Sequence, residues 1–197
     1  LADGRKGWIK KDLVQEPVLA YYRQGFDFYT REAYTQAIEN YKMAVKIDPS
    51  YLPAQFWLAK TYWRAGYEEL TIAKLEEINK QDESYLDARI FATMLAQSYF
   101  RDAQLAFRHK KYKTAAGKFR RVLDLKPTSI TALFLLGESL NQLGLIEEAK
   151  NSWREILKYD PENKRARALL GNNPLDILKT EKRQKEDQAS AINRFQD

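Results

Sequence analysis

The chain has 197 residues, of which 44% are hydrophobic, enough for one domain or one array of repeats with a continuous core. Its 33 Lys and Arg against 27 Asp and Glu give a net charge of +6, and it has one histidine and no cysteine. This composition excludes disulfides and thiolate metal sites and leaves little material for a multi-histidine metal centre. No apolar run reaches the roughly eighteen residues of a membrane-spanning helix. No signal peptide is recognised, but the first residue is Leu1 rather than Met, so the compartment stays open.

Residues 1–16 precede the first periodic segment. The stretch ADGRKGWIKKDLV resembles the closing segment of a bacterial-type SH3 domain, and the matching residues are Asp3, Gly4, Arg5, Gly7, Trp8, Ile9 and Leu13. The resemblance implies an SH3-like module upstream, of a kind common in bacterial cell-envelope proteins. The alternative is a loose N-terminal arm. The envelope or periplasm is therefore only slightly favoured over the cytoplasm.

The remaining chain repeats itself. Pro127 and Pro161 lie 34 residues apart, and Pro49 lies 78 residues before Pro127, which is two periods and ten extra residues. The same intervals separate three other sets of residues: Ala37, Ala115 and Ala149; Tyr41, Phe119 and Trp153; Gly25, Ala103 and Gly137. Several columns sharing one period indicate a structural repeat. Each period holds two amphipathic helical segments, and Gly66 and Gly144 are placed to end first helices in a left-handed conformation.

These columns resemble the tetratricopeptide repeat family. Repeat one supplies Tyr21, Gly25, Phe28, Ala37, Tyr41, Ala44 and Pro49, and repeat four supplies Leu136, Gly137, Leu140, Ala149, Trp153 and Pro161. The resemblance implies an all-α fold, an α-solenoid of helix-turn-helix repeats in a right-handed superhelix with a concave inner face. We expect the array at 17–171, with repeats at 18–51, 52–85, 96–129 and 130–163 and a short capping helix at 164–171.

Ten residues, 86–95, interrupt the array between repeats two and three. They lack Pro and Gly, so we expect them to extend the first helix of repeat three, which then runs from about Glu83 to Arg108. Ile90, Phe91, Met94 and Leu95 are either covered by a neighbouring helix or left bare for a partner. Residues 172–197 are predicted to form a charged C-terminal helix, and Leu175, Ile177 and Leu178 could cap the last repeat.

One stripe of each first helix is predicted to line the concave groove. The same place is aromatic in all four repeats, and a second place is aromatic in three. Cationic residues lie between or beside the rings, which suits binding of a protein segment. The candidate groove residues are Tyr22, Phe26, Tyr29, Phe56, Lys60, Trp63, Arg64, Phe100, Gln104, Phe107, Arg108, Phe134, Glu138 and Asn141.

Two alternatives to groove binding stay open. The rings could serve packing between repeats alone, or the C-terminal helix could fold back into the groove. The family also includes grooves in which Lys and Asn grip the terminal carboxylate of heat-shock chaperones. Here rings stand where that clamp has Lys, and Phe26 stands in place of Asn, so we do not expect that partner.

The basic charge is local. Residues 108–126 hold eight Lys and Arg and one Asp, so this segment carries +7. It is either a solvated outer face or a site for an anionic polymer, a lipid surface or an acidic protein, formed by Lys110, Lys111, Lys113, Lys118, Arg120 and Arg121. No nucleic-acid-binding motif accompanies it, so we do not expect nucleic acid. His109 is expected at a surface turn.

No phosphate loop, metal-ligand spacing or nucleophile elbow occurs in the sequence. We therefore expect no enzymatic activity, no cofactor and no small-molecule substrate. The predicted function is a non-enzymatic scaffold or adaptor that binds a helical or extended segment of another protein, within a bacterial assembly. The alternative is a basic adaptor acting through residues 108–126.

Overall fold

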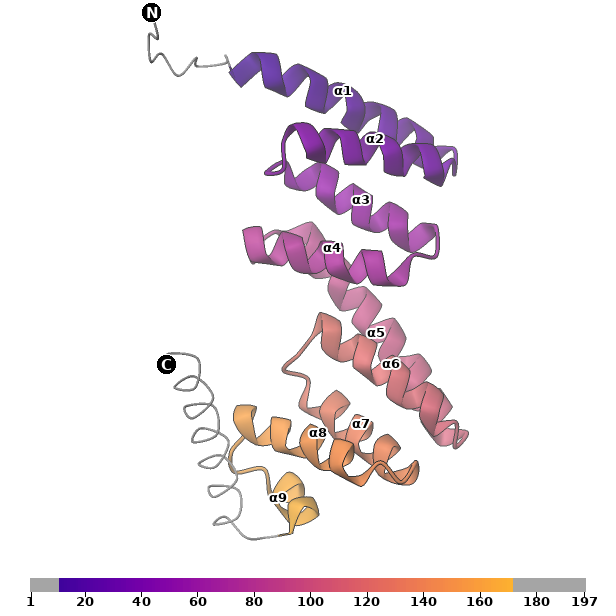
Figure 1. Ribbon diagram of the computed structural model, residues 1–197, viewed down its shortest axis with the longest axis vertical. Coiled ribbons are helices and arrows are strands. Elements are labelled where there is room, and N and C mark those ends of the chain that lie inside the picture. The colour runs from indigo at the N-terminus through magenta and orange to yellow at the C-terminus, as the bar shows by residue number, and fades with distance from the viewer. Residues whose placement is uncertain (1–10, 172–197) are drawn as a thin grey trace, which may run out of the picture. The chain divides into compact units, whose positions relative to one another are not determined.

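A computed structural model describes the backbone of residues 11–171 and the side chains of residues 15–171. This part of the chain is all helical (Figure 1). The helices are α1 (Lys11–Thr30), α2 (Tyr34–Ile47), α3 (Leu52–Arg64), α4 (Glu68–Gln81), α5 (Leu86–Arg108), α6 (Tyr112–Leu125), α7 (Ile130–Gln142), α8 (Ile146–Tyr159) and α9 (Lys164–Leu170). They divide into two compact units, which meet within α5: unit 1, Leu1–Leu95, and unit 2, Ala96–Asp197.

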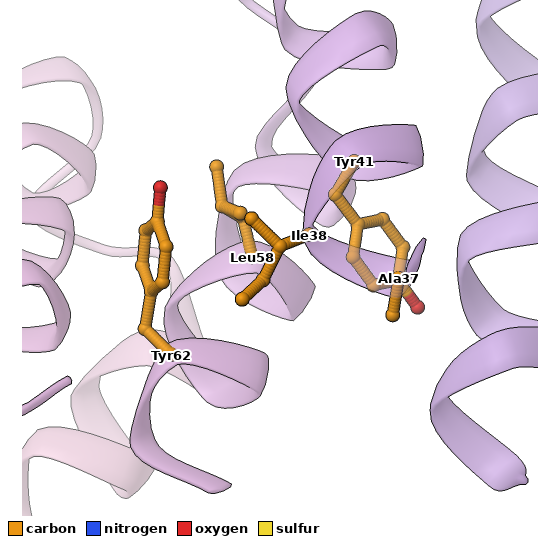
Figure 2. Packing of buried hydrophobic residues seen from close by; sticks show 5 residues of the cluster. All are labelled: Ala37, Ile38, Tyr41, Leu58 and Tyr62. Carbon is orange, nitrogen blue, oxygen red and sulfur yellow. The ribbon is translucent and has the colours of Figure 1, made fainter. Parts of the chain in front are cut away.

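Each unit is a stack of antiparallel helix pairs, as the repeat predicts. In unit 1, α1 packs on α2, α2 on α3, and α3 on α4; in unit 2, α6 packs on α7, α7 on α8, and α8 on α9. Figure 2 shows one layer of the unit 1 core, in which Ile38 and Tyr41 of α2 meet Leu58 and Tyr62 of α3. All four side chains are buried, so the contact between successive repeats is part of the hydrophobic core.

First and second helices approach closely at the glycines of the small-residue column. A Cβ atom on Gly25 would lie 2.8 Å from Cε1 of Tyr41, and one on Gly137 would lie 2.7 Å from Cδ1 of Trp153. Neither ring can move away easily, because Tyr41 and Trp153 are themselves buried. The two largest rings of the repeat column therefore rest directly on glycine backbone.

The turn inside each repeat uses one left-handed residue at the same place. Gly66 (φ 83°) and Gly144 (φ 77°) adopt this conformation, as predicted. The equivalent residues of repeats one and three are Glu32 (φ 59°) and Lys110 (φ 58°), which have side chains. The turn geometry is thus common to all four repeats, but two of them hold it at a steric cost of about 1–2 kcal/mol.

The ten-residue insert is helical and forms the first part of α5. The helix begins at Leu86, three residues later than expected, because Asp82 Oδ1 accepts hydrogen bonds from the amide and hydroxyl of Ser84 and holds 82–85 in a turn. The insert's apolar side chains divide into two groups. Leu95 is buried and Phe91 half-buried, whereas Ile90 and Met94 remain exposed together with Leu86.

Both ends of the described chain differ in detail from the predicted boundaries. Helix α1 starts at Lys11, before the first repeat, and continues through Pro17. At the other end α9 closes on Gly171, which is left-handed (φ 85°). The SH3-like resemblance at 3–13 lies almost entirely outside the described residues, and the predicted C-terminal helix lies outside them.

Candidate partner-binding site

Two neighbouring first helices of unit 1, α1 and α3, bring a group of rings together. The indole of Trp57 lies 4.9 Å from the ring of Phe26 and 5.1 Å from that of Tyr29, both in edge-to-face geometry. Phe26 is 41% exposed, and Tyr29 and Trp57 are half-buried. Such pairs are each worth about 0.5–1.5 kcal/mol beyond their burial, so the rings hold one another while keeping an accessible side.

A cation lies over these rings. Nζ of Lys60 is 4.4 Å from the centroid of the Trp57 ring and 6.0 Å from that of Tyr29. Within residues 15–171, the Lys60 ammonium forms no ion pair or hydrogen bond. Attraction to the ring faces thus positions this charge, and its N–H groups stay available to an acceptor.

Arg64 places a second positive charge one helical turn after Lys60 on α3. Its Nε donates to the Tyr34 hydroxyl at 3.2 Å, and its Nη2 lies 3.7 Å from the Glu32 carboxylate. The hydrogen bond to Tyr34 raises the pKa of the Arg64 guanidinium, while burial raises the pKa of Tyr29. We call Phe26, Tyr29, Trp57, Lys60 and Arg64 the aromatic–cationic face.

Other predicted groove rings of unit 1 pack inside the fold. Phe56 is only 8% exposed, and its ring lies 6.0 Å from Phe91 and 6.2 Å from Tyr85. Tyr22 contacts Tyr51 at 5.6 Å and Tyr41 at 6.0 Å. These two rings join helices, as the packing alternative expects. Trp63 is half-buried on α3.

In unit 2 the equivalent rings are engaged within the unit. Phe100 lies 5.8 Å from Phe119, and Phe107 lies 5.5 Å from Tyr112. Phe134 is 8% exposed and is covered by the Arg165 guanidinium at 3.5 Å, which also pairs with Glu138 at 3.0 Å. Of the remaining candidates, Gln104 is half-buried, while Arg108 and Asn141 are exposed.

Sequence reasoning missed Trp57, the centre of the face. The equivalent places in the other repeats are Arg23, Arg101 and Leu135, so no periodic aromatic column marks it. Its one signal is a second aromatic directly after Phe56. Glu32 and Tyr34 were also missed, because they lie in and just after a turn rather than on the predicted stripe.

The structure divides the predicted basic patch into two parts. Lys118, Arg120 and Arg121 pair with Asp102, Glu148 and Asp124, at 3.0, 2.9 and 3.4 Å. Lys110 and Lys111 are exposed in the turn between α5 and α6, and Lys113 is exposed in the first turn of α6. None of the three has an ion pair within the described part of the chain. His109 is exposed in the turn between α5 and α6, as expected.

Within residues 11–171, no helix combines the length and apolar character needed to cross a membrane. Over the same described range, no group of three or more His, Cys, Asp or Glu side chains is arranged to hold a metal ion. The candidate binding surfaces described above are formed by aromatic, cationic and aliphatic side chains.

Comparisons with known proteins bear on both units. A TPR repeat model matches residues 27–66, and a tetratricopeptide repeat model matches residues 106–172. The chain is 25% identical over 114 residues to the DnaJ homolog subfamily C member 3 homolog of Dictyostelium discoideum, which covers 55% of this chain and 23% of the relative. The chain thus spans about a quarter of that relative's length.

Two of the similar solved structures are the MamA protein and YrrB. The MamA protein has a TM-score of 0.38 and 22% identity, covering 91% of this chain and 90% of that chain. YrrB, described as a TPR protein with an unusual peptide-binding site, has a TM-score of 0.38 and 16% identity. The match covers 77% of this chain and 73% of the YrrB chain. Together, the two family matches support the tetratricopeptide repeat family, and the fold of the chain is an all-α tetratricopeptide solenoid.

Proposed function

We propose that this chain is an interaction scaffold that captures a segment of another protein on the aromatic–cationic face of α1 and α3. Tetratricopeptide repeats in both units support protein binding as the general role. The observation that carries the specific site is the contact of Lys60 with Trp57 at 4.4 Å, beside the exposed ring of Phe26. A cation with no carboxylate partner among residues 15–171, placed on accessible rings, is suited to recognition.

The face defines the chemistry of the segment it would take. An apolar or aromatic side chain can bury itself against Phe26 and Trp57, with roughly 1–3 kcal/mol available from each good anchor. An acidic side chain next to it can accept hydrogen bonds from Lys60. After ordering costs, a few such anchors give micromolar affinity that weakens only modestly with salt.

Two further parts of the proposal, the groove residues of unit 2 and the kind of assembly, rest on the sequence pattern alone. In unit 2, Phe100, Phe107 and Asn141 remain candidate groove residues on the sequence pattern. A place in a bacterial cell-envelope assembly is inferred from the SH3-like resemblance at residues 3–13. The alternative occupant is the chain's own segment 172–197, and deletion of that segment tests it.

A peptide selection tests the site. Peptides would be selected from a random library on the immobilised full chain, and the best would be titrated by calorimetry. We expect selected peptides to combine an acidic residue with an aromatic or large aliphatic one. The substitutions Phe26→Ala and Lys60→Gln should each weaken binding by roughly tenfold, since each removes one anchor.

The matched control is Leu70→Ala, which truncates an exposed apolar side chain elsewhere in unit 1. It should leave the affinity unchanged. Trp57→Ala should abolish binding, with circular dichroism melting used to verify that the fold persists. Unchanged affinity in both Phe26→Ala and Lys60→Gln would rule out this face. Stronger binding after deletion of 172–197 would identify that segment as the competitor.

A further inference from the structure

The turn between α5 and α6 concentrates positive charge at one end of the unit 2 helices. Arg108, Lys110, Lys111 and Lys113 are all exposed there, with His109 between them. None of the four cations has an ion-pair partner in the described range 15–171. The cations that follow along α6 are neutralised by acidic neighbours, so the net charge of the segment is concentrated at the turn.

The next turn of the same unit, between α7 and α8, exposes aliphatic side chains instead. Leu143, Leu145 and Ile146 are 41%, 43% and 45% exposed. The two acids that follow do not make this turn negative, because both are paired. Glu147 bonds Lys150 at 3.0 Å, and Glu148 bonds Arg120 at 2.9 Å.

The two turns lie at the same end of unit 2. Helix α6 packs on α7, and the Arg120–Glu148 pair fastens the start of α8 beside α6. Figure 1 shows the α5–α6 turn and the α7–α8 turn at the same side of this unit, opposite the α6–α7 and α8–α9 connections. A single flat surface can therefore meet both turns, and we call these seven residues the docking edge: Arg108, Lys110, Lys111, Lys113, Leu143, Leu145 and Ile146.

We propose that the docking edge binds the surface of an anionic lipid bilayer. Clustered Lys and Arg are attracted to anionic headgroups, and neighbouring aliphatic side chains can enter the boundary between headgroups and acyl chains. A bilayer supplies both chemistries in one plane. This inference is independent of the aromatic–cationic face, which lies in unit 1.

Other anionic partners fit the docking edge less well. Single-stranded nucleic acid is bound by stacking bases on accessible rings, but the nearby rings of Phe107 and Tyr112 pack on each other at 5.5 Å. An acidic polymer would satisfy the lysines and leave Leu143, Leu145 and Ile146 exposed to water. The fold alone does not create the edge, since the corresponding turns of unit 1 carry Glu32, Glu68 and Glu69.

Vesicle sedimentation of the full chain tests this proposal. We expect binding to vesicles of phosphatidylcholine with phosphatidylserine and little binding to phosphatidylcholine alone. Replacing Lys110, Lys111 and Lys113 by Gln should weaken binding by roughly tenfold or more. Replacing Lys42, Lys46 and Lys164 by Gln removes the same charge from exposed sites elsewhere and should change binding little.

A second pair of variants separates a bilayer from a soluble polyanion. Leu143→Gln with Ile146→Gln should weaken vesicle binding severalfold and leave binding of inorganic polyphosphate unchanged. Equal binding to both vesicle types, or full binding by the variant lacking Lys110, Lys111 and Lys113, would overturn the proposal. So would vesicle binding that the Leu143 and Ile146 changes do not affect, because the edge would then recognise anionic charge alone. The Phe26→Ala variant should bind vesicles as well as the unaltered chain does. A failure of the proposed peptide site can therefore be told apart from a failure of the proposed bilayer site.

Discussion

Helices α3 and α7 occupy the same place in their repeats, yet they carry opposite charges at one position. Lys60 of α3 and Glu138 of α7 each follow a buried phenylalanine by one helical turn. Lys60 lies on the half-buried ring of Trp57, whereas Glu138 is tied to Arg165, which covers Phe134. The same repeat thus leaves a cation accessible in unit 1 and closes the equivalent surface with α9 in unit 2.

The largest expected effect comes from the packing that both units share. Gly25→Ala and Gly137→Ala should each destabilise their unit by about 1–3 kcal/mol, because the new methyl group overlaps a buried ring. Denaturant unfolding would measure the loss. The control is Gly117→Ala on the exposed face of α6, where a Cβ meets nothing within 4 Å and stability should rise by about 0.5–1 kcal/mol.

A compensating change sharpens this test. Repeats two and three pair Ala59 with Leu75 and Ala103 with Phe119 in the same columns. Adding Trp153→Phe to Gly137→Ala should therefore recover part of the loss. Additive destabilisation in the double variant would show that the ring and the glycine do not interact as the distances indicate.

High pH should destabilise unit 1. Burial raises the pKa of five tyrosines of unit 1 above the ordinary value of 10.0: Tyr22, Tyr29, Tyr41, Tyr51 and Tyr85. Unfolded tyrosines ionise first, so the stability of unit 1 is complete below about pH 10 and falls as the pH rises above it. Hydrogen exchange at rising pH should show α2–α4 opening before α7–α8.

Tyrosine substitutions provide the control for the alkaline transition. Tyr51→Phe and Tyr85→Phe remove two of the ionising groups and should move the loss of unit 1 to higher pH. Equal opening of both units, unaffected by these changes, would contradict the assignment.

The left-handed turns allow a comparison among repeats. Glu32→Gly and Lys110→Gly should stabilise their units by about 1 kcal/mol, because glycine adopts φ near 60° without steric cost. Gly66→Ala and Gly144→Ala should cost a similar amount. Thermal melts of the four single variants would measure this, and the same sign in all four would be inconsistent with a shared turn geometry.

The smallest effect concerns the α9 cap. Arg165→Ala removes an exposed ion pair with Glu138 and the contact with Phe134, and should loosen α9 by up to about 1 kcal/mol. Faster hydrogen exchange in α9, with α2–α4 unchanged, would be the readout. Lys158→Ala, which also removes a surface pair in unit 2, should not alter exchange in α9.

The sequence alone determined the repeat and much of its internal packing. A recurring column of small residues, among them Gly25 and Gly137, predicted that two helix backbones approach closely there, because a small side chain leaves room for the neighbouring helix. Gly66 and Gly144 predicted left-handed turns, because glycine lacks the side chain that disfavours them. Proline spacing did not mark the end of every repeat. Repeat two has Glu83 in place of proline, and its closing turn is held by the hydrogen bonds between Asp82 and Ser84.

Only the tertiary structure decided which rings are accessible. Phe26 and Phe56 belong to the same predicted stripe, but Phe26 is exposed while Phe56 is enclosed by Tyr85 and Phe91. The contacts of Trp57 and the ion pairs of Lys118 and Arg120 depend on side chains from other helices. Periodicity fixes the direction of a side chain from its own helix, whereas burial and charge pairing depend on neighbours distant in the sequence.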